Sequence, residues 1–93
     1  MNQNEELLIR KAQRGNIAAF EELVKRYENK VMSIILDMLN DVEDARDVYQ
    51  DVFMKVFLTI KKFRFQSKFY TWLFRIAVNT SINFRKKRTS QTV

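Results

Sequence analysis

Neither cysteine nor histidine occurs in this sequence of 93 residues. Without cysteine the chain forms no disulfides, thiolate zinc sites or cysteine nucleophile, which fits a reducing cytosol. Without histidine it lacks the commonest general base and the commonest transition-metal ligand. A glycine-rich phosphate loop is missing as well. We therefore expect a cytoplasmic binding protein that is not an enzyme and that uses no cofactor or metal.

Proline is absent and Gly15 is the only glycine, so little in the sequence interrupts a helix. Apolar residues recur with the 3.6-residue period of a helix. The pattern predicts an all-α fold, a compact bundle of about four helices over residues 4–14, 17–39, 42–61 and 68–87. The expected N-caps are Asn4, Asn16, Asp41 and Ser67. Residues 89–93 are expected to form a frayed tail or the start of a linker.

Acidic residues are missing from the second half of the chain, because none follows Asp51. That half interleaves Lys and Arg with Phe, Tyr and Trp, and the whole chain has a formal net charge of +6. Such a surface suits nucleic acid, in part single-stranded, since cations hold phosphates and flat rings stack on bases. The acidic and amphipathic first half suits a protein partner.

The segment from Lys61 to Tyr70 alternates cationic and aromatic residues between two predicted helices. Helical phase places Phe69 in the core, with Phe63 partly buried. Phe65 and Tyr70 are harder to bury at the same time. Exposed rings beside Lys and Arg would form a stacking surface for unpaired bases. The alternative is a plain connector whose rings fold back into the core.

The third predicted helix carries an acidic stripe opposite its apolar face. Asp44, Asp47 and Asp51 are spaced by three and four residues and share one side of the helix. Gln50 lies beside them. The stripe is either an ordinary solvated surface or a site for a basic protein partner. A divalent cation fits poorly, because a single helix face supplies poor octahedral geometry.

The fourth predicted helix carries a polar row. Arg75, Asn79 and Asn83 repeat every four residues, so their side chains follow one another along the helix. Arg and Asn read base edges or hold phosphates, and the row could lie along a groove. A solvent-facing polar surface is the alternative. The helix ends in a basic run that includes Arg85 and Lys86.

Three strings make the chain resemble a known family. They are DARDVYQDVFMK from Asp44 to Lys55, the pair Phe63-Arg64, and FYTWLFRIAVN from Phe69 to Asn79. Together they resemble region 2 of bacterial RNA polymerase sigma factors, and most of all the extracytoplasmic-function (ECF) group. The residues from Ala12 to Tyr27 are also similar to the start of that group, so the resemblance covers nearly the whole chain.

The resemblance implies a compact helical bundle that grips a coiled coil on the β′ subunit of core RNA polymerase and binds the promoter −10 element. Asp47, Gln50 and Asp51 match positions that face the polymerase, which gives the acidic stripe, Asp44 included, that partner. Phe63 and its neighbours match a loop that captures a base flipped from the non-template strand. The residues expected to contact DNA are Lys55, Lys61, Lys62, Phe63, Arg64, Phe65, Lys68, Tyr70, Arg75, Asn79, Asn83, Arg85 and Lys86. Trp72 is assigned mainly to the core.

Two departures from the family pattern bear on function. Many relatives carry a small or acidic pair after the Phe-Arg of the loop, whereas Phe65 and Gln66 stand here, which affects the choice of base. Family members normally continue with a helix-turn-helix domain that reads the −35 element. None is present in this sequence, and we expect the chain to be the N-terminal domain of a longer factor.

Other functions are open at this stage. An anti-sigma protein is an expected additional partner, and it would hold the exposed apolar and acidic faces. A metal-dependent nuclease would have to use Asp44, Asp47 and Asp51. A membrane-binding basic helix is disfavoured, because the core needs the apolar face of the fourth helix.

Overall fold

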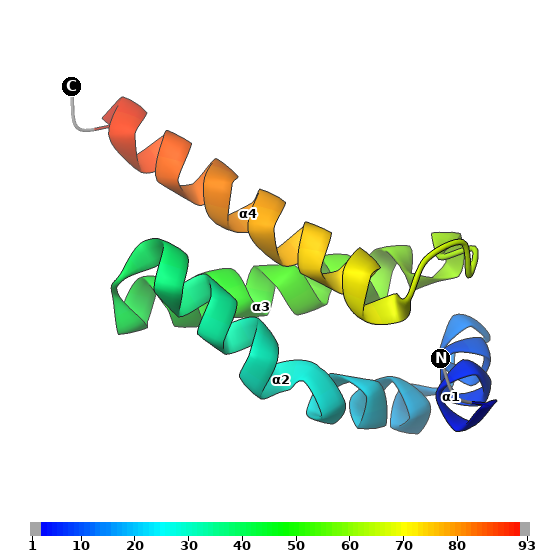
Figure 1. Cartoon of the computed structure of the whole chain (residues 1–93). Helices are drawn as coiled ribbons and strands as arrows, with labels where there is room; N and C mark the ends of the chain where they lie inside the picture. Colours follow the sequence, from blue (N-terminus) through cyan, green and yellow to red (C-terminus); the bar gives the residue numbers. More distant parts are fainter. Residues whose placement is uncertain (1–2, 92–93) are drawn as a thin grey trace.

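Four α-helices make up most of the chain in the computed structural model, which describes residues 3–91. They are α1 (Gln3–Gln13), α2 (Ile17–Leu39), α3 (Val42–Thr59) and α4 (Phe69–Gln91), and a short 3-10 helix, η1 (Ile60–Lys62), follows α3. The predicted all-α bundle is thereby confirmed (Figure 1). None of the described helices is long and apolar enough to cross a membrane.

The turn between α1 and α2 depends on Gly15. Its φ of +94° is a left-handed conformation that costs glycine little. The amide of Gly15 donates to the carbonyl of Ala12, and that of Asn16 to the carbonyl of Lys11, both at 3.0 Å. This pair of bonds is a Schellman motif. Asn16 then begins α2 as its N-cap, because its Oδ1 accepts from the amide of Ala19 at 3.0 Å.

The turn between α2 and α3 uses two adjacent polar residues. Asn40 has a φ of 54°, and its amide closes α2 by donating to the carbonyl of Leu36 at 2.8 Å. Asp41 follows with extended backbone and accepts from the amide of Asp44 at 2.9 Å. The expected N-caps Asn16 and Asp41 are therefore confirmed.

The other two expected N-caps are wrong. Asn4 lies inside α1, which already includes Gln3. The hydroxyl of Ser67 donates to the carbonyl of Lys68 at 3.2 Å and accepts from no amide of α4. That carbonyl takes the first helical bond, from the amide of Trp72 at 3.2 Å. The start of α4 is thus fixed by the burial of its first residue, Phe69, and not by a capping side chain.

The core lies between α2, α3 and α4, and α1 packs across one end of the bundle. Figure 1 shows α1 at the same end as the connection from α3 to α4, with the C-terminal end of α4 at the opposite end. The largest completely buried side chains are Ile9, Leu23, Val31, Ile35, Val48, Val52, Val56, Phe69 and Leu73. α1 and the connection from α3 to α4 therefore lie at the same end of the molecule.

Tyr27 ties α1 and α4 to α2. Its hydroxyl donates to the carboxylate of Glu5, and its ring stacks on Tyr70 with centroids 5.7 Å apart. It also contacts Phe69, at 5.8 Å. Burial, together with the Glu5 carboxylate, raises the pKa of the Tyr27 hydroxyl above its ordinary value.

The raised pKa of Tyr27 makes stability fall in alkali. Above the ordinary tyrosine pKa of about 10, the unfolded chain gives up its proton first, so the free energy of unfolding decreases as the pH rises. Tyr27→Phe should lower the free energy of unfolding by about 1 kcal/mol at neutral pH. Above pH 10, the free energy of unfolding of this variant should fall less steeply with pH than that of the wild type. Urea unfolding followed by circular dichroism checks both. Burial also raises the pKa of Tyr49, so the variant should still lose some stability as the pH rises. Parallel curves for the two proteins would contradict this account.

Candidate nucleic-acid interface

The loop of residues 63–68 joins η1 to α4 and has a cavity on each side. The α4-side cavity has a volume of about 360 Å³. Its lining consists of Lys62, Phe63, Arg64, Gln66, Ser67, Trp72 and Arg75. The α1-side cavity has a volume of about 320 Å³. Its lining consists of Glu6, Phe65, Gln66, Ser67 and Lys68. Gln66 and Ser67 therefore border both.

Phe63 forms the floor under the loop. Its side chain is only 4% exposed, although the sequence suggested partial burial. Its ring meets Phe69 edge to face at 5.5 Å and tilts against Trp72 at 5.4 Å. Trp72, assigned mainly to the core from the sequence, is only partly buried and lines the α4-side cavity. Of the two rings that line this cavity, Trp72 is therefore the more exposed.

The other two rings of the loop region point elsewhere. Phe65 packs on Phe63 with centroids 4.9 Å apart and lies under the guanidinium of Arg10, 4.4 Å from its carbon. Tyr70 faces α2, where it stacks on Tyr27 and lies 5.4 Å from the ammonium of Lys30. Neither ring lines the α4-side cavity. The sequence therefore predicted that both rings lie near the loop. It did not predict that Phe65 packs against α1 and Tyr70 against α2.

The α4-side cavity is positively charged. Lys62, Arg64 and Arg75 line it, and no acidic residue does so among residues 3–91. Arg64 and Arg75 are exposed. Cations beside a partly exposed indole are the arrangement that holds a phosphate and a stacked base together. Lys61 is exposed but lies outside this lining.

The polar row of α4 is exposed, as a groove-facing row requires. Arg75, Asn79 and Asn83 are all exposed. Lys86 follows Arg75 by about three helical turns and continues the row. Lys55 joins α3 to this helix, because its Nζ donates to Oγ1 of Thr80 at 3.3 Å. The row runs from the α4-side cavity toward the C-terminal end of α4.

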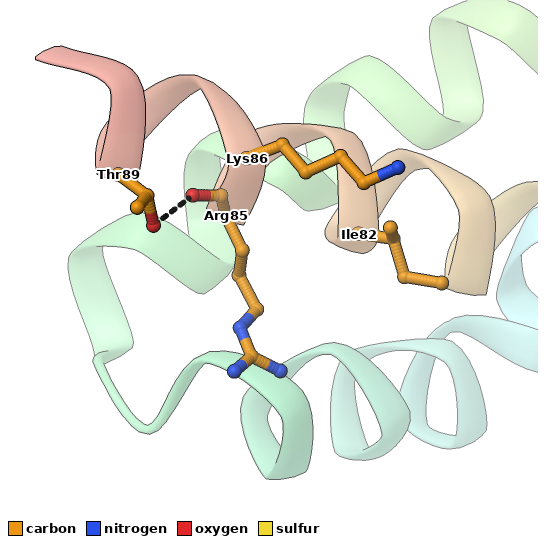
Figure 2. A pocket seen from close by; sticks show the side chains of 4 residues that line it. All are labelled: Ile82, Arg85, Lys86 and Thr89. Atoms are coloured by element: carbon orange, nitrogen blue, oxygen red, sulfur yellow. Dashed lines mark hydrogen bonds between the residues drawn. The ribbon is translucent and has the colours of Figure 1, made fainter.

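A hollow near the end of α4 has a volume of about 510 Å³ and is lined by Ile82, Arg85, Lys86 and Thr89. In Figure 2 the side chains of Arg85 and Lys86 extend in different directions. The hydroxyl of Thr89 donates to the carbonyl of Arg85 at 3.0 Å, which is a contact within the helix. The two cations therefore do not point toward one common position in this hollow.

The residues of the acidic stripe of α3 differ in exposure and in their contacts. Asp47, Gln50 and Asp51 are exposed. Asp44 differs, because its side chain is only 14% exposed and its carboxylate pairs with Arg88 of α4. One to two turns further along α3 lie the exposed apolar side chains of Met54, Phe57 and Leu58. Among residues 3–91, no group of three or more acidic side chains is placed to hold a metal ion.

Comparison with known families decides the relationship. The sequence model described as Sigma-70 region 2 matches residues 23–91. The chain belongs to this family. The resemblance seen in the sequence is thereby confirmed, and this sigma region 2 domain also has relatives in the ECF group.

Two curated relatives illustrate the similarity. The RNA polymerase sigma-H factor of Pseudomonas aeruginosa is 40% identical over 81 residues, covering 87% of this chain and 42% of that protein. The ECF RNA polymerase sigma-E factor of Escherichia coli K12 is 41% identical over 80 residues, covering 86% of this chain and 41% of that protein. The chain thus spans less than half the length of these relatives.

A solved structure shares the fold over the full length. It is the NMR structure of the complex formed by an engineered region 2 of sigmaE with GTAAAA. It matches with a TM-score of 0.87 and 34% sequence identity, over 98% of this chain and 97% of the other. The arrangement of helices around the loop is therefore that of a sigma region 2 domain.

Sequence reasoning missed three residues of the α4-side cavity in this sigma region 2 domain. Gln66, Ser67 and Trp72 line it, and none was among the expected DNA contacts. Gln66 and Ser67 carried a signal, since polar residues in a loop between aromatics are placed to meet a ligand. Trp72 carried none, because its position on the helix is compatible with the core.

The buried floor predicts unequal costs for two phenylalanines. Phe63→Ala should lower the free energy of unfolding by about 3–5 kcal/mol, because it empties a buried site. The control Phe74→Ala removes a ring that is 39% exposed and should cost only about 1 kcal/mol. Chemical denaturation of both variants measures the difference. Equal costs would show that Phe63 is not the floor.

Proposed function

We propose that this chain is the −10-recognition domain of an ECF sigma factor, which binds single-stranded promoter DNA and core RNA polymerase to start transcription. The observation that supports this best is the α4-side cavity, with an aromatic wall and three cations. The solved relative that shares the fold was determined in complex with GTAAAA. The proposed mechanism is binding, without catalysis.

The cavity offers a reason for promoter opening. Turning a base out of the duplex costs a few kcal/mol. Stacking on Trp72 contributes about 1–3 kcal/mol, and Lys62 and Arg75 can hold the neighbouring phosphates. Gln66 and Ser67 carry both donors and acceptors for the edge of a base. Since only a melted strand can place a base there, binding favours the open promoter.

The exposed row of α4 extends the proposed DNA site upstream. Arg75, Asn79, Asn83 and Lys86 follow one another from the cavity along the helix. Their amide and cationic groups suit phosphates and base edges of the upstream part of the −10 element. The row is continuous with the cavity through Arg75, which belongs to both.

The proposed polymerase site is the exposed side of α3. Asp47, Gln50 and Asp51 provide acidic and polar groups, and the exposed Met54 and Phe57 provide apolar area beyond them. Basic and apolar residues on a partner would complement such a surface, and the proposed partner is the coiled coil of the β′ subunit. Asp44 is assigned instead to holding α4, because its carboxylate pairs with Arg88.

Three further parts of the proposal follow from the family. The whole factor would carry a helix-turn-helix domain for the −35 element. It would be held by an anti-sigma protein until it is needed. It would act in the cytoplasm, where the polymerase and the chromosome meet.

The cavity predicts a preference for single strands. Fluorescence anisotropy should show tighter binding of labelled single-stranded GTAAAA than of its duplex or of a scrambled strand, with affinity falling steeply with salt. Trp72→Leu should weaken GTAAAA binding about tenfold or more, since a stacking ring is lost. Arg75→Gln should weaken all strands and reduce the salt slope by about 1.

The matched control for the charge is Arg46→Gln, which removes an exposed arginine from α3 outside both loop cavities. It should leave GTAAAA binding within about twofold of the wild type, because only long-range charge is lost. Equal affinity of the wild type for GTAAAA and the scrambled strand would reject base capture.

The acidic stripe predicts the effect of charge reversal. Asp47→Lys with Asp51→Lys should abolish binding to a β′ coiled-coil fragment, because like charges then face each other. Helical content should be unchanged, since both side chains are exposed. Asp37→Lys, an exposed change on α2, serves as the control and should bind normally. Surface plasmon resonance measures the binding of the wild type, the double variant and the control. Normal binding by the double variant would show that the acidic stripe is not the polymerase site.

A further inference from the structure

The loop of residues 63–68 packs against α1, a helix that precedes the residues matched by the family model. We propose that Gln13 and Arg10 of α1 are positioning residues that fix the loop of residues 63–68 for base discrimination. This inference rests on the proposed function of the loop. Figure 1 shows α1 beside that loop at one end of the molecule.

Gln13 closes the end of the α3–η1 unit. Its Nε2 donates to the carbonyls of Ile60 and Phe63, each at 2.9 Å. The carbonyl of Ile60 also accepts from the amide of Phe63 at 3.1 Å, so Gln13 adds a second donor at the end of η1. Both acceptors are carbonyls, so only the NH₂ end of the amide fits here. One side chain therefore fixes the last turn before the loop and its first residue, Phe63.

Arg10 holds the next part of the loop. Its guanidinium lies over the ring of Phe65, 4.4 Å from the centroid, and its Nη2 is 3.0 Å from Oε1 of Glu6. Phe65 has a φ of 60°, a left-handed conformation that a residue with a side chain adopts rarely. The contacts of its ring with Arg10 and Phe63 compensate for that conformation.

The orientation of Phe65 decides what enters the α4-side cavity. Because its ring is held on the α1 side, the following residues, Gln66 and Ser67, are left to line the α4-side cavity. A loop released from α1 would sample other conformations, and ordering it again would weaken binding of the strand that it reads. Binding through phosphates alone does not need an ordered loop. The loss should therefore appear in discrimination between strands.

The test compares four single variants of the whole chain, of which Arg10→Lys is the conservative change at that position. Gln13→Glu keeps the size of the side chain but turns an acceptor toward two carbonyls. Arg10→Ala removes the cation above Phe65. Arg14→Ala is the matched control, since it removes an equally charged, exposed side chain of the same helix end that lies outside the lining of both loop cavities. Circular dichroism establishes that each variant is folded.

The expected result is a loss of discrimination. The ratio of affinities for single-stranded GTAAAA and a scrambled strand should fall about fivefold in Gln13→Glu and Arg10→Ala, with the salt slope unchanged in Gln13→Glu. Arg14→Ala should keep the wild-type ratio, and Arg10→Lys should restore most of it. If both test variants keep the wild-type ratio, the inference is overturned.

A second readout does not depend on DNA. Amide hydrogen exchange of residues 63–68 in the free protein should be about fivefold faster or more in Gln13→Glu and Arg10→Ala, and unchanged in Arg14→Ala. In a Phe65→Leu background, Arg10→Ala should have no further effect, because the ring it contacts is gone. Unchanged exchange in both test variants would overturn the role of α1. A wild type without strand preference would reject the proposed function, while exchange still decides whether α1 holds the loop.

Discussion

The contact of Phe63 with Phe69 and Trp72 is the constraint on which the functional end of this molecule depends. Phe63 is the first residue after η1, and Phe69 is the first residue of α4. Burial of both rings fixes the two ends of the loop in one cluster, with the large apolar contribution that aromatic side chains make. Of the residues between them, Phe65 packs on Phe63, and the others lie further from the core. Their polar side chains are left around two cavities, where a ligand can reach them.

The same packing brings the two differently charged halves of the chain together. α3 begins acidic and packs against α4, whose charged side chains are all basic. Two contacts join these helices: the Asp44–Arg88 pair and the bond from Lys55 to Thr80. The first is an ion pair between the exposed Arg88 and the largely buried Asp44, and the second is a hydrogen bond from an ammonium to a hydroxyl, so both fix how the two helices lie against each other. As a result, the domain has an acidic exposed surface on α3 and a basic exposed surface on α4.

Phe65 combines a disfavoured backbone conformation with a large side chain. Its φ of 60° is a conformation suited to glycine, yet it carries a large ring. That ring is placed between Phe63 and Arg10, so the disfavoured backbone and the packing against α1 belong together. A substitution in the loop has therefore to be judged with the helix that supports it.

The sequence by itself determined the four helices, the caps Asn16 and Asp41, the turn at Gly15 and the separation of charge. These features depend on residues three or four positions apart, which a local pattern records. Only the tertiary structure decided which aromatic ring is buried and which is reachable, and it showed that Ser67 does not cap α4. Several rings of similar character compete for one small core next to the loop. Their allocation depends on contacts between residues far apart in sequence, such as Gln13 with Ile60, and no local spacing encodes those.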